Sequence, residues 1–307
     1  MSTPDLDPEV VATPEPGAAE TPPKESATRS RPLPARVWAQ TQGKVGVVLT
    51  AAVVLVALAG PLLAPWLTGY SPTEFADRPF QSTGVFGTDN LGRSVGARFL
   101  AGGLLLLAYS VLATTLGLVV GCTIGMIGGY AGGRTDSVIM RLNDIVLAFP
   151  QLVLALLAIV VLGPHGWVLV TVIGLTHAPR IARVARAATL GVVSEDYIRA
   201  AEMYAVPRTR ILAREVLPNI TGPLSVEAGL RLTYSIGAIA SLSFLGLGMQ
   251  PPAADWGLMI NENRIALSVQ PWGVILPVLA IAVLTIGTNL LADAVARATA
   301  STTVEAS

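Results

Sequence analysis

The sequence has few charged residues, one cysteine and two histidines. Only 13% of its 307 residues are charged, against about 25% in a typical soluble domain, so a soluble globular chain is disfavoured. The lone Cys122 excludes an intrachain disulfide, and His165 and His177 lack the spacing of a metal site. The formal net charge is zero, which gives no general attraction to nucleic acid or another polyanion.

Motifs for nucleotide or metal chemistry are also missing. Gly43 and Lys44 are followed by Val45, without the glycine loop of an ATP-binding P-loop, and the sequence has no H-E-x-x-H motif. The serines in the apolar runs have no evident base partner. We therefore expect no catalytic residues, no metal and no cofactor in this chain.

What the sequence does contain is long apolar runs. Hydrophobic residues make up 52% of the chain, and the runs approach the roughly 20 residues that cross a bilayer as a helix. The sequence predicts an all-α integral membrane protein with six transmembrane helices. Charged residues intrude on the fourth and fifth of them. The six spans are expected at 45–67, 104–128, 145–162, 167–184, 224–247 and 272–296.

The segments outside these spans differ in charge. Residues 1–40 are rich in Pro, Glu, Thr and Ala, a composition typical of a disordered tail, and residues 298–307 form a second tail. Arginine and lysine concentrate before the first span and between the fourth and fifth, which predicts that both termini are cytoplasmic. The long loop after the first span carries Arg78, Arg93 and Arg98, a count that fits this orientation less well.

Small residues recur at every fourth position in the second span. Gly117, Gly121, Gly125 and Gly129 fall on one helical face, where they let another helix backbone approach closely. Two interpretations fit this row: a static tight crossing, or a helix that lines a moving interface.

Charged side chains near the predicted helix ends occur in pairs at helical spacing. Ionisable residues at membrane depth are costly and often functional. Because all three pairs lie near predicted cytoplasmic helix ends, we expect interfacial anchoring from them instead. The pairs are Glu227 with Arg231, Asp293 with Arg297, and Arg141 with Asp144.

Residues 194–219 are polar within this apolar chain. Ser194, followed by two acids, predicts a helix start, and Pro207 predicts the first turn of a second helix that stops before Pro218. Four residues of the first helix lie at i, i+3, i+4 and i+7 and share a face. The periodicity leaves two interpretations open, an amphipathic helix lying on lipid or a docking helix for a cytoplasmic partner. The four residues are Tyr197, Ala200, Ala201 and Tyr204.

This segment resembles the cytoplasmic coupling loop of ATP-binding-cassette importer permeases. Ala200 and Ala201 match the two alanines of the family signature, and Leu217-Pro218-Asn219 matches its end. Arg199 stands where the family often has Glu, and Ala205 where it usually has Gly, so we expect ordinary backbone angles or a gentler turn at Ala205. The resemblance implies that the following residues contact the ATPase subunits: Tyr197, Arg199, Ala200, Ala201, Glu202, Tyr204, Ala205, Pro207, Leu217 and Pro218.

Further motifs resemble the second (C-type) permease subunit of the dipeptide and oligopeptide branch, which also includes nickel importers. They cover residues 40–297. An external loop motif comprises Gly87, Thr88, Asp89, Gly92 and Arg93, with Ser94 in place of the usual Asp. The other matching stretches are Gly129-Tyr130 to Phe149-Pro150, Ser243 to Gly248, Pro251-Pro252, Trp256-Gly257, Pro271-Trp272 and Pro277.

The resemblance implies a type I importer permease in the cytoplasmic (inner) membrane. It would work with a second permease subunit, two cytoplasmic ATPase subunits that bind ATP and Mg, and an extracytoplasmic peptide-binding protein. The external loops 70–100 and 249–270 are expected to meet that binding protein. Nickel or nickel-chelate import is the alternative within the family, and a stand-alone membrane channel or interaction protein is the alternative from another class.

Overall fold

The computed structural model describes residues 33–305. Most of the predicted tail 1–40 lies outside the described residues, but its end forms the helix α1 (Leu33–Ala39). This helix packs on the last helix of the chain through Val37, which is buried against Ala294 and Ala298. Residues 33–39, which their composition placed in the predicted disordered tail, are therefore part of the folded unit.

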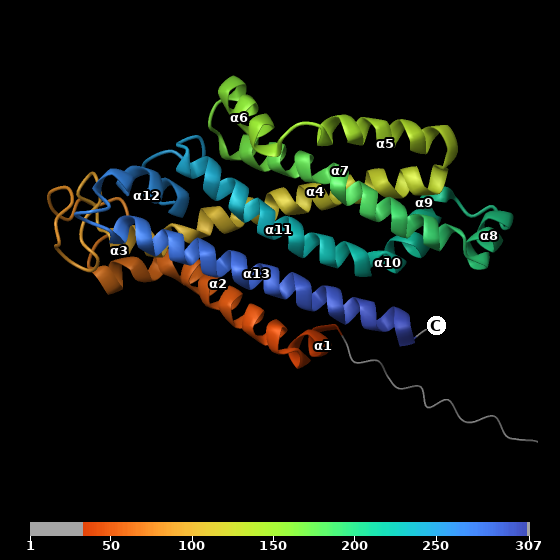
Figure 1. Ribbon diagram of the computed structural model, residues 1–307, viewed down its shortest axis with the longest axis horizontal. Helices are drawn as coiled ribbons and strands as arrows, with labels where there is room; N and C mark the ends of the chain where they lie inside the picture. Colours follow the sequence, from red (N-terminus) through yellow and green to blue (C-terminus); the bar gives the residue numbers. More distant parts are fainter. Residues whose placement is uncertain (1–32, 306–307) are drawn as a thin grey trace, which may run out of the picture. The chain divides into compact units, whose positions relative to one another are not determined.

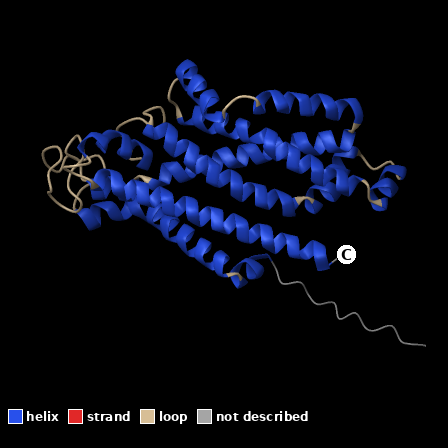
Figure 2. Ribbon diagram, viewed as in Figure 1, coloured by secondary structure: helices blue, strands red, loops and turns tan. Residues whose placement is uncertain are grey.

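The described residues are helical, without a named strand, as Figure 2 shows. Two isolated bridges, Phe75 with Arg93 and Thr88 with Ser94, are the extended pairings found within that range. The all-helical prediction is confirmed. The long helices are α2 (Thr41–Thr68), α4 (Gly103–Ala131), α7 (Gly166–Val193), α11 (Thr221–Phe244) and α13 (Trp272–Glu305).

Within residues 33–305, four helical stretches are long and apolar enough to cross a membrane, or five if a bent pair counts as one span. The stretches are α2, α3 (Val95–Ala101) continued by α4, α7 and α13. The fifth predicted span corresponds to α11, which is long enough for a span but carries the buried charges of Glu227 and Arg231. The last helix continues through the predicted C-terminal tail as far as Glu305.

The third predicted span, 145–162, is not one straight helix. It divides between α5 (Gly133–Leu147) and α6 (Gln151–Leu162), which are bent by 79° relative to each other. Pro150 explains the break, because it disfavours helical angles at Phe149 and cannot donate a backbone hydrogen bond. In Figure 1, α5 runs beside α7, and α6 stands at a steep angle to α5.

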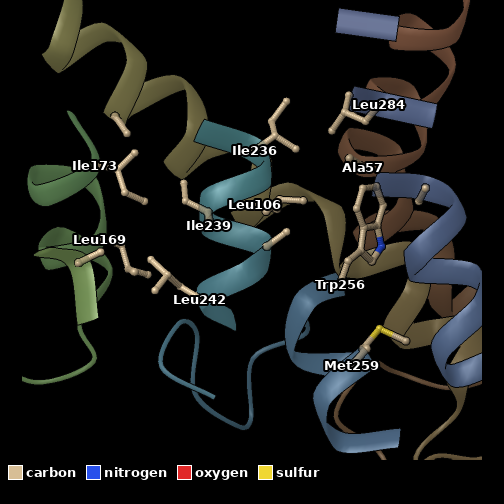
Figure 3. Close-up of a cluster of buried hydrophobic side chains, with 14 of the residues drawn as sticks. Ala57, Leu106, Leu169, Ile173, Ile236, Ile239, Leu242, Trp256, Met259 and Leu284 are labelled. Carbon is tan, nitrogen blue, oxygen red and sulfur yellow. The ribbon is translucent and has the colours of Figure 1, made fainter. Parts of the chain in front are cut away.

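The main core lies between α4, α7, α11 and α13, where apolar side chains from distant parts of the chain meet (Figure 3). Trp256 belongs to α12 (Trp256–Asn263) and is fully buried. Its indole Nε1 donates a hydrogen bond of 2.8 Å to the carbonyl of Phe99, as a buried tryptophan requires. The core therefore reaches from the middle of the bundle to the loops at one end.

Candidate functional site

The segment 194–219 forms one end of the bundle, where α8 (Asp196–Met203) projects beyond the long helices (Figure 1). Ile198 is its buried residue, 1% exposed, and packs in a cluster with Cys122, Ala185 and Ile211. Because these partners come from α4, α7 and α9 (Arg208–Ile211), the helix is seated on the membrane bundle.

The outward face of α8 differs in part from the prediction. Tyr197, Ala200 and Tyr204 point outward, with 44% of Tyr197 and 84% of Tyr204 exposed. Ala201, predicted on the same face, is half-buried against the cluster of Ile198. Met203 is 87% exposed and joins the outward face. An apolar surface on a short polar helix is typical of a protein contact.

Side-chain hydrogen bonds also hold the segment in place. The Tyr130 hydroxyl of α4 donates to Glu202 Oε1 at 2.6 Å, and Asn219 Nδ2 donates to the Tyr197 hydroxyl at 3.2 Å. Arg199 Nη1 lies 3.6 Å from Asp196 Oδ1, but both side chains are largely exposed. Such a surface pair contributes little to stability, which leaves Arg199 available to a partner.

Ala205 ends α8 in the left-handed region, with φ of 55°. The N–H of Ala205 donates to the carbonyl of Glu202, and the N–H of Val206 donates to the carbonyl of Ala201. These two bonds define a Schellman cap with Ala205 at the position that glycine usually holds. The expectation of ordinary angles or a gentler turn at Ala205 is therefore wrong, since the sharp turn is kept with a strained alanine.

The start of α8 also differs from the prediction. Ser194 makes no cap, because its hydroxyl donates to the carbonyl of Gly191 at 2.7 Å, in the preceding turn. Glu195 holds the N-cap position without a side-chain hydrogen bond. Asp196 lies in the first turn, where the helix dipole favours an acid.

The second helix begins after Pro207 and does not stop at Pro218. α9 is followed by a π-helical turn, Leu212–Val216, and then by α10 (Leu217–Asn219), which contains Pro218. Proline lacks the N–H for a regular bond, and widening the turn before it accommodates the loss. The chain continues into α11, so this segment is joined almost directly to a long helix.

The glycine row of the second span packs on α7. A Cβ built at Gly117 would lie 2.8 Å from the carbonyl oxygen of Gly174, and one at Gly121 would lie 2.5 Å from that of Ala178. Gly125 and Gly129 face the same helix and are buried. The two backbones are thus closer than any side chain at these positions would allow.

The predicted charge pairs are found in one case of three. Glu227 and Arg231 form a buried ion pair of 2.8 Å within α11. Asp144 is instead paired with Arg183 of α7 at 2.5 Å. A second bridge, Arg186 with Asp136 at 2.5 Å, further ties α5 to α7.

The third pair is replaced by contacts between the two ends of the chain. In the described structure Arg297 donates to Gln40 and Gln42 rather than pairing with Asp293. The spacing of Asp293 and Arg297 along one helix could not reveal Gln40 and Gln42 as partners, because these residues come from the start of the chain.

The external loop motif folds around Asp89, which is completely buried. Its Oδ1 accepts hydrogen bonds of 2.9 Å from the N–H groups of Leu91 and Arg93. Its Oδ2 lies 2.8 Å from Arg93 Nε and 2.5 Å from Arg98 Nη1. Glu262 contacts both arginines, at 3.2 Å and 2.5 Å, so two acids balance two guanidinium groups.

Other motif residues fix the turns around this cluster. Thr88 donates to the carbonyl of Arg78 at 2.7 Å. Gly87 and Gly92 have φ of 73° and 84°, a region that glycine tolerates. Ser94, in place of the expected Asp, caps α3 by accepting from the N–H of Ala97, a role that Asp also fills.

Sequence reasoning missed Arg98 and Glu262, the partners that complete the cluster. In the sequence, Arg98 was only one of three arginines in the loop after the first span, which fitted the predicted orientation of the membrane helices less well. Its burial with an acid removes that discordance, because the positive-inside rule concerns charges in short exposed loops. No local spacing links Glu262 to this motif, since 164 positions separate it from Arg98.

The three groups of predicted site residues therefore lie in different places along the bundle. Segment 194–219 is at one end, and the loops around Asp89 and α12 are at the opposite end (Figure 1). The glycine row lies on α4, between them. The described bundle therefore combines apolar helices long enough to span a membrane with an exposed apolar helix face at one end and a buried charge cluster at the other.

Comparison with known proteins identifies the family. Residues 117–301 match the model of the binding-protein-dependent transport system inner membrane component, and the chain belongs to this family. It is thus a membrane permease component. The predicted resemblance is confirmed.

Curated relatives cover most of the chain. A dipeptide transport system permease protein of Alkalihalophilus pseudofirmus is 33% identical, over 81% of this chain and 82% of the relative. An oligopeptide transport system permease protein of Bacillus subtilis is 32% identical, over 81% and 82%. A glutathione transport system permease protein of Pectobacterium atrosepticum is 34% identical, over 78% and 81%.

Proposed function

We propose that this chain is a permease subunit of an ATP-driven importer of dipeptides or oligopeptides. The similarity to relatives named for peptide transport supports this substrate class. The chain would form half of the translocation pathway beside a second permease. Two cytoplasmic ATPase subunits would bind ATP and Mg, and an extracytoplasmic protein would deliver the peptide.

The outward face of α8 carries the proposal. Tyr197, Ala200, Met203 and Tyr204 present apolar area at the tip of the bundle, while Ile198 and the cap at Ala205 hold the helix rigidly behind it. Lipid burial is the other way to cover such a face. A cap and a buried anchor that project the helix past the spans favour a protein groove.

The assembly assigns a side of the membrane to each end. We infer that segment 194–219 and both termini are cytoplasmic, because the arginine-rich segments then lie on the positive side. The loops around Asp89 and α12 would lie outside and meet the peptide-binding protein. Cysteine accessibility at exposed positions of the two ends, such as Tyr204 and Leu91, tests this orientation in intact cells.

Ala200→Trp tests the coupling role. Ala200 is exposed, so a bulky side chain adds no strain to the permease but blocks close approach of a partner. We expect the complete importer with this variant to lose peptide uptake, while the ATPase subunits keep their basal hydrolysis. Ala201→Trp is less clean, because Ala201 packs against the bundle.

Thr135→Trp supplies the matched control. Thr135 is exposed in the first turn of α5, outside segment 194–219, and we expect uptake near that of the wild type. Wild-type uptake by Ala200→Trp would refute docking through this face. Ion conduction by the purified chain alone would instead support the channel alternative.

A further inference from the structure

A small pocket with polar groups lies where the α5–α6 bend meets α7. Its volume is about 250 Å³, and it is lined by residues 146–151 together with Thr176 and Arg180. Volumes of about 300–1,000 Å³ are usual for sites that enclose a whole small molecule. This pocket is therefore suited to one end of a ligand.

Arg180 is the cation of the pocket and lies near the middle of α7, 14 residues after Gly166 and 13 before Val193. The next arginines along the helix, Arg183 and Arg186, form ion pairs with acids of α5. Within the described residues Arg180 has neither an ion pair nor a side-chain hydrogen bond, although it is exposed to the pocket. An ionisable residue in a membrane-spanning helix is costly unless a partner reaches it.

The depth of Arg180 follows from helix lengths. α6 has 12 residues, or about 18 Å at 1.5 Å per residue, less than the roughly 30 Å of a hydrocarbon core. Arg180 lies about 21 Å along α7 from Gly166, where the turn 163–165 joins the two helices. Measured from that turn, both the bend and Arg180 lie within the thickness of the core.

Other groups in the pocket also favour an anion. Gln151 Nε2 is buried and has no hydrogen-bond partner. It lies in the first turn of α6, ahead of the first backbone bond of that helix, from the Leu154 N–H to the Pro150 carbonyl. Free N–H groups and the helix dipole add to the positive potential here. The planar guanidinium of Arg180 matches the geometry of a carboxylate.

A larger apolar cavity adjoins the pocket. Its volume is about 640 Å³, and it shares Val146 and Thr176 with the polar pocket. Asn143 of α5 lines one part, and Leu157, Ala158 and other apolar side chains of α4, α6 and α7 line the rest. An anionic group and an apolar group of one ligand would therefore be accommodated side by side.

We propose that the pocket at Arg180 binds the C-terminal carboxylate of the transported peptide, with the adjoining cavity taking its last side chain. This inference rests on the proposed peptide import. It predicts a preference for peptides that end in an apolar residue. A phospholipid has the same two parts, so the test below compares a peptide acid with its amide in order to separate the peptide carboxylate from a lipid phosphate.

Reconstituted importers that carry Arg180→Gln test the proposal. Uptake of alanyl-leucine is compared with uptake of its C-terminal amide, in vesicles that contain the same binding protein. Because that protein discriminates identically in every sample, a change in the acid-to-amide ratio reports the permease. We expect uptake of the acid to fall about tenfold to a hundredfold, the range for loss of a charged hydrogen bond, and the amide to change little.

Two further variants sharpen the test. Arg183→Gln removes an exposed charge one turn away and is expected to keep the wild-type ratio. Arg180→Lys keeps the charge without the planar fork, so it should recover part of the acid uptake. Ala158→Phe fills the apolar cavity and should lower uptake of alanyl-leucine relative to alanyl-glycine.

The outcomes separate the two proposals. Equal loss of acid and amide uptake, or no loss at all, overturns the carboxylate site while peptide import stands. An equal loss that appears only in vesicles with anionic lipid assigns the pocket to lipid phosphate and also overturns it. If the wild-type importer takes up neither peptide, the proposed function fails and the carboxylate site fails with it.

Discussion

Replacing Ala205 by glycine should stabilise the end of α8. Ala205 has φ of 55° at the C′ position of a Schellman cap, and the left-handed region costs a residue with a Cβ about 1–2 kcal/mol. Glycine removes this strain but has more freedom in the unfolded segment, which offsets about 0.5–1 kcal/mol. We expect a net gain of about 0.5–1 kcal/mol in the local stability of the cap.

Amide hydrogen exchange measures this gain where it arises. The N–H groups of residue 205 and Val206 make the two cap bonds, to the carbonyls of Glu202 and Ala201. If they exchange through local opening of the cap, a gain of 0.5–1 kcal/mol slows their exchange about twofold to fivefold. A peptide fragment covering 201–207 reports both, and Pro207 contributes no N–H.

Two control variants predict changes of the opposite sign. Ala200→Gly lies within α8, where glycine costs about 1 kcal/mol relative to alanine, so exchange should become faster. Ala205→Val puts a branched side chain at positive φ and should also open the cap. Unchanged or faster exchange in Ala205→Gly, or protection in Ala205→Val, would refute the strained cap.

Four other substitutions test the bundle and the external loops. Arg98→Met leaves two buried carboxylates poorly compensated and should cost about 3–5 kcal/mol, measured as a lower thermal unfolding temperature of the solubilised protein. Gly121→Ala places a Cβ 2.5 Å from the Ala178 carbonyl and should destabilise the protein by about 1–3 kcal/mol, whereas Gly191→Ala meets open space and should stabilise it by up to about 1 kcal/mol. Burial raises the pKa of the Asp255 carboxyl to about 6, so the folded protein binds more protons than the unfolded chain between about pH 4 and 6, and its stability falls as pH rises through this window. Asp255→Asn should remove about 3 kcal/mol of this loss of stability. The measurement is the pH profile of unfolding, which should become flatter.

Periodicity located α8 and most of its exposed residues, but it could not orient the helix fully. The spacing of Tyr197, Ala200, Ala201 and Tyr204 defines one face, and an aromatic face is equally compatible with packing inward or outward. Ile198 decides the orientation, because it meets a pocket formed by α4, α7 and α9. The inward turn of Ala201 and the exposure of Met203 follow from that tertiary contact.

The two prolines show how far local rules reach. Pro150 ends a helix as proline usually does, and the two halves bend by 79°. Pro218 has the same chemistry but lies in a helix that a π-helical turn carries past it. The difference lies in the buried contacts of Val216 and Ile220 beneath the segment, which a rule based on neighbouring residues does not contain.

The external cluster shows the same limit for charge. Asp89 and Arg93 are four residues apart and form a pair of 2.8 Å, so a local pattern indicates half of the cluster. Arg98 and Glu262 join it through the packing of α3 against α12, which brings distant residues together. Motif resemblance marked the loop as important without showing that buried charge holds it.

The path from α8 into the membrane is short and stiff. Ile198 packs with Cys122 of α4 and Ala185 of α7, and these two helices touch along the glycine row at backbone distance. A backbone contact has no side-chain rotamers to absorb a displacement, so a push on α8 should move α4 and α7 as one body. Asp144 and Asp136 tie α5 to α7, and the bend at Pro150 is the place where this body can change its angle to α6. Arg180 faces that bend, so the proposed carboxylate pocket should change shape when α8 is displaced.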